Sequence, residues 1–572
     1  MGYNKSLLLL SFLCLSSTVF AQLSTNEQPV SFDLKTDGLA STVPTVVMPE
    51  LDMAKIEAED LEDEKYDMPP RFGYPHKVNL DLTNSGIWQD LPDGGRLWRL
   101  NVACPKASSI NFLYDKFWIP EGGKFFIYTT DRGQHIGAFT SQNNKGDRSQ
   151  LRGFATQPLF GSEVTLEYYE PGNVVEEAII SINYIVHGYR YYGIGRFGFA
   201  GECNVNMNCS EGQPWQNEKN AVALILVQGS RICTGSLLNT TSQGQDPYFL
   251  IANHCLWNVP INNHTDTVTY DAISNPNLDG TTLYWNYEAA GCDTGDDEPI
   301  PYTTSGATVI ANNSISDFAL LQLSEDPKNI IGFAPFYLGW DCSGDSGEPG
   351  VCIHHPRGDV KKISSVLLSP ISTSYTNETE NSNGKYWKVN WKSTDNGFGL
   401  IEKGSSGAPL MNSYHKTIGQ LRGGNDDCIY NTEADWFGKF SVSWTGNGNS
   451  SIYRRLNYWL DSQNVAPQTM EGLRVVSTAT TITISGQLYG NMLVKGSGQL
   501  TIQANVEMKG SNTLTVESGG KLIINGATLS NANINLKPGA TLRIINNGII
   551  DPRTNFYAPV GAIVDIQYGQ IL

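Results

Sequence analysis

Basic residues are scarce in this 572-residue chain, which has 39 Lys and Arg against 57 Asp and Glu and a formal charge of −18 at pH 7. This balance argues against nucleic acids and anionic membranes as partners, because both repel an acidic protein. Long apolar runs are also lacking: beyond the N-terminal segment none reaches about 18 residues, so no membrane span is expected. Cysteine and histidine show no zinc-site spacing, and we predict neither a metal nor another cofactor.

Glycine, asparagine, threonine and tyrosine are abundant, which favours β structure, and the length suggests roughly three or four domains. Residues 1–21 combine Lys5, an apolar run over 7–15 and a small-residue end at Ala21, as in a secretory signal peptide. We therefore expect a secreted or extracellular protein.

The next two stretches differ in composition. Residues 22–70 are acidic and low in aromatics, which is typical of a flexible, exposed segment. Residues 71–196 contain short alternating runs separated by turn residues, at 97–102, 123–128 and 163–169. Period-2 alternation of this kind predicts a small all-β domain.

A glycine- and serine-rich turn at 403–410 carries the first candidate for chemistry. Its sequence Gly404-Ser405-Ser406-Gly407 precedes an apolar run that restarts a strand. Glycines beside a serine allow tight backbone conformations and close approach of a substrate. We interpret Ser406 as a nucleophile and the N–H groups of Gly404 and Ser406 as oxyanion donors, although such turns are commonly only structural.

Two residues upstream could complete this site. His254 follows an apolar strand, and its neighbour Cys255 could bridge to Cys233 and thereby fix the imidazole. Asp317 enters an otherwise apolar strand, where its charge is costly unless a group such as an imidazole N–H needs it. The order His254, Asp317, Ser406 is that of chymotrypsin and differs from those of subtilisin and the α/β-hydrolases.

Short motifs lie in order between about residues 198 and 465: Cys233-Thr234-Gly235-Ser236-Leu237, His254-Cys255, Ser316-Asp317-Phe318-Ala319-Leu320-Leu321, Gly339-Trp340-Asp341, Ile353-His354-His355-Pro356, Gly404-Ser405-Ser406-Gly407 and Ser443-Trp444-Thr445-Gly446. Together they closely resemble the bacterial lysyl endopeptidases, a secreted branch of the trypsin-like serine proteases. The resemblance implies a chymotrypsin-like double β-barrel over 197–465 that hydrolyses proteins or peptides.

In that family a prosegment precedes the protease, so the resemblance implies that residues 22–196 form a removable prodomain. A permanent carbohydrate- or protein-binding β-domain is the alternative. The link at 191–198 contains Arg196, after which a trypsin-like enzyme could cut. Ser405 stands where pancreatic relatives have the aspartate that pairs with a new N-terminus, so removal of a blocking prodomain is the simpler route to activation.

The cysteines fit a secreted protein. Of ten in the chain, Cys14 would leave with the signal and Cys104 precedes the protease region, which leaves eight between 203 and 428. An even set predicts disulfide bridges but leaves their pairing open. The resemblance implies three of the pairs and leaves the last two cysteines to pair across a glycine-rich loop: Cys203–Cys428, Cys209–Cys292, Cys233–Cys255 and then Cys342–Cys352.

The resemblance also implies substrate-binding residues. Leu400 stands where trypsin carries its pocket aspartate, and the lysyl endopeptidases place the pocket acid on a later strand, at the position of Asp435. An aspartate in an apolar slot would favour a lysine ammonium, whereas a surface aspartate is the alternative. Trp391 matches a tryptophan beside the triad. Arg422 replaces the family's histidine and could pair with Asp317, so the preference for lysine over arginine stays open.

A longer repeat begins after about residue 466. Cysteine disappears, aromatics become rare, and short runs starting at Gly498, Gly520, Ala540 and Ala562 follow one another at spacings of 22, 20 and 22 residues. Short strands at that period, with Gly and Asn at the corners, predict a β-solenoid over 466–572. It could contact polysaccharide or a cell surface, or could stabilise the enzyme, and no aromatic row marks a sugar platform.

The sequence thus predicts a mainly β, secreted serine endopeptidase that cleaves after basic residues, with lysine preferred. His254 would deprotonate Ser406, and Asp317 would hold the imidazole. The competing hypothesis is a surface or matrix-binding adhesin with an inactive protease-like domain.

Overall fold

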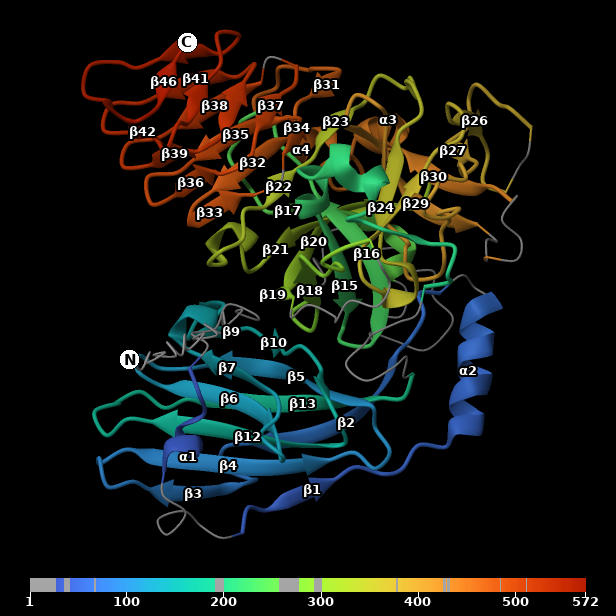
Figure 1. Cartoon of the computed structure of the whole chain (residues 1–572). Coiled ribbons are helices and arrows are strands. Elements are labelled where there is room, and N and C mark those ends of the chain that lie inside the picture. The colour runs from blue at the N-terminus through green and yellow to red at the C-terminus, as the bar shows by residue number, and fades with distance from the viewer. Residues whose placement is uncertain are drawn as a thin grey trace, which may run out of the picture.

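The computed structural model describes residues 27–34, 42–65, 68–190, 200–256, 277–292, 301–376, 379–424, 428, 433–483, 485–510 and 512–572. The expected signal peptide at 1–21 and Arg196 of the predicted processing link lie outside the described residues. In Figure 1 a β-sandwich in blue and teal lies below two larger sheets in green to orange, and a stack of short strands in red packs beside those sheets.

The sandwich is built from short alternating strands, and its two sheets bury large apolar side chains such as Trp98, Phe117 and Tyr168. One sheet has the order β1 (Thr45–Val47), β4 (Arg96–Ala103), β12 (Glu163–Glu170), β6 (Lys124–Thr129), β7 (His135–Phe139), with β3 (Ile87–Asp90) beside β4. The other has the order β10 (Phe154–Ala155), β5 (Ser109–Trp118), β13 (Ile179–Gly188), β2 (Gly73–Asp81), with β11 (Leu159–Phe160) beside β5. A separate hairpin pairs β8 (Gly146–Asp147) with β9 (Gln150–Leu151).

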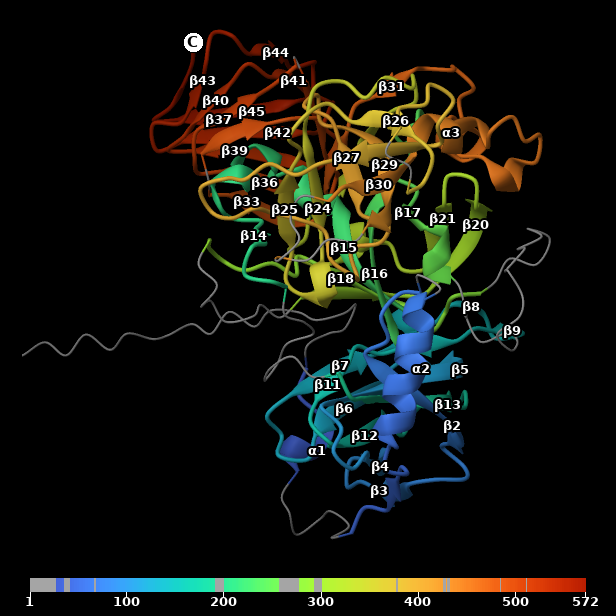
Figure 2. The ribbon, with the colours of Figure 1, turned by 90° about the vertical axis from the view of Figure 1, so that its right-hand side faces the viewer.

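The described parts of residues 22–70 contain helical structure, where their composition suggests a flexible segment. Besides the short α1 (Val30–Asp33) they contain helix α2 (Met53–Lys65), which runs from the sandwich towards the larger sheets (Figures 1 and 2). Asp60 of α2 is buried and accepts hydrogen bonds from Arg71 and Arg190. These charge-assisted contacts hold a helix that has few apolar residues. Within the described ranges, no helix is long and apolar enough to cross a membrane.

The two larger sheets are the barrels of a chymotrypsin-like fold, and a shared apolar core joins them. The first has the order β19 (Tyr302–Ser305), β18 (Thr282–Trp285), β15 (Val222–Val227), β16 (Arg231–Leu237), β17 (Tyr248–Ala252), β21 (Phe318–Leu323), β20 (Ala307–Asn313). The second has the order β14 (Val205–Asn206), β25 (Lys362–Ser365), β24 (Val351–His354), β28 (Pro409–Met411), β29 (Lys416–Gly424), β30 (Asp435–Lys439), β27 (Tyr386–Val389), β26 (Ile371–Thr373). Strand β23 (Gly339–Asp341) pairs with β29 and with β31 (Thr469–Met470), and α3 (Phe440–Thr445) and α4 (Asn457–Leu460) follow β30 in the chain.

The C-terminal part is a parallel β-solenoid of about five turns, so the predicted repeat is confirmed. Leu500, Leu522, Leu542 and Val564 occupy equivalent rungs of neighbouring strands, at the spacings read from the sequence. One sheet stacks β32 (Leu473–Val476), β35 (Asn491–Val494), β38 (Thr513–Val516), β41 (Asn533–Leu536), β44 (Asn555–Tyr557). The others stack β33 (Ala479–Ile482), β36 (Gln499–Ile502), β39 (Lys521–Asn525), β42 (Thr541–Ile545), β45 (Ile563–Gln567), and β34 (Gly486–Leu488), β37 (Val506–Met508), β40 (Thr528–Ser530), β43 (Ile549–Ile550), β46 (Gln570–Ile571).

The solenoid and the double barrel share one sheet. Strand β22 (Phe336–Tyr337) lies in the barrel region of the chain but pairs with β32, and Leu473 of β32 packs into the barrel core. Nearby, His415 stacks between Trp215 and Tyr489, with ring centroids 3.9 and 3.5 Å away. The solenoid is therefore joined to the barrel by main-chain hydrogen bonds and by stacked rings.

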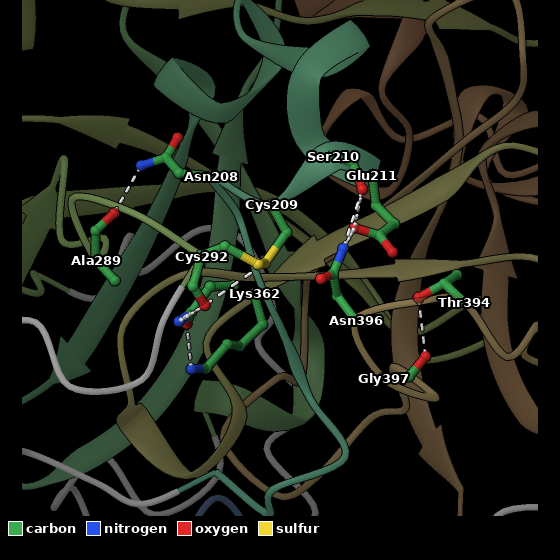
Figure 3. The surroundings of a disulfide bond; sticks show 11 residues. Asn208, Cys209, Ser210, Glu211, Ala289, Cys292, Lys362, Thr394, Asn396 and Gly397 are labelled. Carbon is green, nitrogen blue, oxygen red and sulfur yellow. Dashed lines mark hydrogen bonds between the residues drawn. A yellow bond between two sulfur atoms is a disulfide. The ribbon is translucent and has the colours of Figure 1, made fainter.

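Three disulfides form, at the pairs that the resemblance implies: Cys203–Cys428, Cys209–Cys292 and Cys233–Cys255. Figure 3 shows the second of these, beside Asn208, whose side-chain amide donates to the carbonyl of Ala289 at 2.6 Å. The bridge ties the start of the double barrel to the loop after β18.

The predicted bridge between Cys342 and Cys352 is wrong, since both cysteines are free. The two side chains pack in different places. Cys342 contacts the shared core of the two barrels, whereas Cys352 of β24 is buried inside the second barrel with Trp391 and Leu410. Burial raises the pKa of the Cys352 thiol well above its usual value, so this thiol stays protonated.

Candidate active site

His254 lies in a short 3₁₀ helix (Asn253–Leu256) after β17, and the disulfide of Cys255 ties this helix to β16. The imidazole is 1% exposed, and its Nδ1 lies 2.7 Å from Asp317 Oδ2. The main-chain N–H of His254 donates to Asp317 Oδ1 at 2.9 Å. One carboxylate thus holds both the ring and its backbone, and the second ring nitrogen is left on the side away from Asp317.

Ser406 lies in the turn before β28. Its carbonyl accepts a hydrogen bond from the N–H of Thr234 at 2.9 Å, and Thr234 Oγ1 donates to the carbonyl of Gly404 at 3.0 Å. Thr234 belongs to β16, the strand that also carries Cys233 of the disulfide. The same strand therefore positions the serine turn and the histidine.

Two main-chain N–H groups in this turn have no hydrogen-bond acceptor among the described residues. Gly404 has φ +99°, a conformation in which a side chain would be strained. In the part of the chain that the structure describes, the N–H groups of Gly404 and Ser406 donate to no acceptor, whereas those of Ser405 and Gly407 bond to main-chain carbonyls. Two unbonded N–H groups beside a serine are the donors that an oxyanion needs.

A cavity of about 540 Å³ has both His254 and Ser406 in its wall. The double barrel supplies much of the remaining wall, including Tyr375, Lys403, Leu421, Arg422, Gly424 and Asp435. The N-terminal part closes the other side with Glu64, Met68, Pro69, Pro70, Arg71, Phe72 and Arg190. The cleft of the double barrel is thus covered by residues from before the barrel in the chain.

Asp435, the first residue of β30, is fully buried beside this cavity. Trp391 Nε1 donates to Asp435 Oδ2 at 2.6 Å. Gly424 of β29 makes room for the carboxylate, because a Cβ there would lie 1.9 Å from Asp435 Oδ1. Trp391 is buried and is not among the described residues that line the cavity, so its contact with the predicted substrate slot is made through Asp435.

Arg422 lies between Asp317 and an aromatic side chain that the sequence did not single out. Its Nε is 3.5 Å from Asp317 Oδ2, and its guanidinium carbon lies 4.8 Å from the ring centroid of Tyr375. Arg422 and Tyr375 both line the cavity. Tyr375 follows β26 in an irregular connection, where no periodic signal could have marked it.

Sequence reasoning gave His354 no part in positioning the nucleophile. Its Nδ1 lies 2.8 Å from Ser405 Oγ, directly beside Ser406 in the chain, and its Nε2 lies 2.9 Å from Ser364 Oγ. Ser405, which lacks the charge of the pancreatic aspartate, is thus held by a neutral ring. The motif Ile353-His354-His355-Pro356 is visible in the sequence. It could not show which residue His354 contacts, because Ser405 lies about 50 positions further along the chain.

The buried histidines make stability depend on pH. Burial, with a smaller contribution from the charge of Lys362, lowers the pKa of His354 from 6.5 to about 3. Between these values the unfolded chain binds the extra proton, so stability should fall as pH drops below 6.5, by roughly 1.4 kcal/mol per pH unit for this histidine. In a Ser406→Ala background, the added substitution His354→Gln should flatten the decline of the thermal unfolding midpoint between pH 6.5 and 4. An unchanged decline would contradict the assignment.

Comparison with known proteins supports a protease. A family model for the C-terminal domain of lysyl endopeptidase matches residues 197–438. The lysyl endopeptidase of Pseudomonas aeruginosa is 27% identical over 392 residues, which is 62% of this chain and 76% of that protein.

The similarity to solved protease structures is low. The serine endoprotease from Yersinia pestis is 14% identical with a TM-score of 0.26, over 42% of this chain and 65% of that chain. The MamO protease domain from Magnetospirillum magneticum is 11% identical with a TM-score of 0.23, over 40% of this chain and 96% of that chain. TM-scores of this size are too low to support the fold, which rests on the strand orders described above.

The matched range contains the histidine, the serine and both acidic residues discussed above, and its lysyl endopeptidase relative aligns with well over half of the chain. The chain is a lysyl endopeptidase-like protein and a serine endopeptidase.

Proposed function

We propose that the protein is a secreted endopeptidase that cleaves after lysine through an acyl-enzyme on Ser406. The observation that carries this proposal is the 2.7 Å contact between His254 Nδ1 and Asp317 Oδ2, in a cleft whose wall includes Ser406. Three disulfides and the leader-like residues 1–21 support secretion.

In this mechanism His254 takes the proton of Ser406 as the hydroxyl attacks the substrate carbonyl, and Asp317 stabilises the resulting imidazolium. The N–H groups of Gly404 and Ser406 bind the oxyanion. His254 then gives this proton to the leaving amine, which departs as the C–N bond breaks and leaves the acyl-enzyme. The neutral imidazole next deprotonates a water molecule that hydrolyses the acyl-enzyme, and the proton returns to Ser406 as the acid product leaves. Arg422 adds a positive charge beside Asp317 and offsets part of its field.

Asp435 would accept the ammonium of the lysine side chain that precedes the scissile bond. Because the carboxylate is fully buried, its charge discriminates strongly against neutral side chains. Trp391 already bonds to Oδ2, which disfavours a two-point contact with the planar guanidinium of arginine relative to a single contact with lysine.

Residues 22–196 would serve as a removable prodomain. Support comes from the stretch 68–72, which lines the cavity of Ser406 and pairs with β16: the N–H of Ile232 donates to the carbonyl of Pro70 at 3.0 Å. A segment in this place excludes an extended peptide from the cleft, so its removal would activate the enzyme.

Peptide mapping of digested casein by mass spectrometry tests the proposal. We expect cuts after lysine, with few or none after arginine. Cuts after glutamate or leucine would contradict the role of Asp435. A chain that neither cuts casein nor reacts with a serine-directed fluorophosphonate after processing would favour the inactive, adhesin-like alternative.

A further inference from the structure

Two cations at the rim of the cleft have their acidic partners in the N-terminal part of the chain. Arg231 Nη2 lies 2.6 Å from Asp63 Oδ2, and Lys403 Nζ lies 3.1 Å from Glu64 Oε1. Arg231 immediately precedes Ile232, which lines the cavity, and Lys403 immediately precedes Gly404. Arg357 also lines the cavity, but its acidic partner, Glu402, belongs to the double barrel and not to the N-terminal part.

The chain that carries these acids docks in an extended form. The N–H of Ile232 donates to the carbonyl of Pro70, the N–H of Phe72 donates to the carbonyl of Ser230 at 2.9 Å, and Arg231 Nη1 donates to the carbonyl of Pro69 at 2.8 Å. Residues 69–72 therefore lie antiparallel to the start of β16, as a peptide adding to a strand edge would.

The position of Asp435, the predicted binding site for the substrate lysine, indicates which part of a substrate lies near Arg231 and Lys403. Asp435 and Gly424 lie on β30 and β29 of the second barrel, so the residues before the scissile bond lie along that sheet. Arg231 lies on β16 of the first barrel, a different sheet, whose Thr234 bonds to the serine turn. The residues after the scissile bond, which leave with the amine, therefore pass Arg231 and Lys403.

From these contacts we infer that Arg231 and Lys403 bind acidic side chains that follow the scissile bond in peptide substrates, and that Asp63 and Glu64 occupy this site in the intact chain. The inference rests on the proposed function and adds a substrate class to it: lysine followed by acidic residues. Arg231 is the stronger partner, since its side chain is 12% exposed and that of Lys403 is 60% exposed.

The test uses the enzyme after proteolytic removal of the N-terminal part, which takes Asp63, Glu64 and the segment 68–72 out of the cleft. The substrates are two quenched fluorescent peptides that each contain a single lysine. The second and third residues after the scissile bond are Glu-Glu in one peptide and Gln-Gln in the other. We expect kcat/KM to be about 3–10-fold higher for the Glu-Glu peptide at low salt, and the ratio to shrink at high salt.

Further substitutions test which residues cause the preference for the Glu-Glu peptide. Arg231→Gln should bring the ratio close to one, and Lys403→Gln, at an exposed position that tolerates change, should lower it partly. The matched control Lys521→Gln, on an exposed solenoid strand, should leave the ratio unchanged. Equal hydrolysis of both peptides would overturn this inference alone. Labelling of Ser406 by a fluorophosphonate without hydrolysis of either peptide would contradict cleavage after lysine, and this inference with it. Absence of both labelling and hydrolysis would overturn the proposed function and this inference with it.

Discussion

Replacement of Ser406 by alanine is expected to lower kcat for a lysine peptide by about 10⁵–10⁶-fold and to abolish covalent labelling by a fluorophosphonate. The reason is that His254 and Asp317 then have no hydroxyl to activate, while the N–H groups of Gly404 and residue 406 still bind the oxyanion and leave a residual rate. Initial rates and label incorporation, followed on the same preparation, measure both effects.

Ser413→Ala is the matched control, because this serine lies in the turn after β28 and its hydroxyl makes no hydrogen bond with the described part of the chain. It should label and hydrolyse like the unaltered protein. Persistent labelling of the Ser406→Ala protein would show that the nucleophile is a different residue.

The isosteric change Asp435→Asn is expected to lower kcat/KM for lysine peptides by about 10²–10³-fold, because the buried ammonium of the substrate would lose its charged partner. Trp391 could still donate to the amide oxygen of asparagine, so the slot should keep its shape. Peptides with leucine in place of lysine should change little, which makes the ratio of the two substrates the informative measurement.

Glu433→Gln provides the control for this change, since Glu433 is exposed and only two positions away. Equal losses for lysine and leucine peptides in Asp435→Asn would mean that the carboxylate supports the fold of the slot and does not select the substrate.

Periodic features of this protein could be predicted from the sequence. The solenoid repeat was visible because each coil must bury Leu and Ile at one rung, and Leu500, Leu522 and Leu542 occupy such rungs. Strands of the barrels were visible as apolar runs, such as the run that leads into His254 and the run that follows Asp317. The candidate site residues were found by their local context and by resemblance.

Apart from the contacts of Asp317 with His254 and Arg422, the contacts between distant polar groups could not be predicted. An acidic helix such as α2 has the composition of a solvated segment, and nothing local shows that Asp63 meets Arg231 across the cleft. The pairing of Cys342 with Cys352 failed because elimination by count ignores where each side chain packs, which is against the shared barrel core for Cys342 and inside the second barrel for Cys352. The ring of His354 serves the serine turn through a contact over many residues.

The strand β22 limits how the chain can be divided. Phe336 and Tyr337 complete a solenoid sheet from within the protease segment, and Leu473 fills the barrel in return. A recombinant enzyme ending near residue 465 would lose the Leu473 side chain from its core and expose an unpaired strand edge, which invites aggregation. A useful truncation would keep the first coil and end after Val494, so that catalysis and the outer coils could be studied separately.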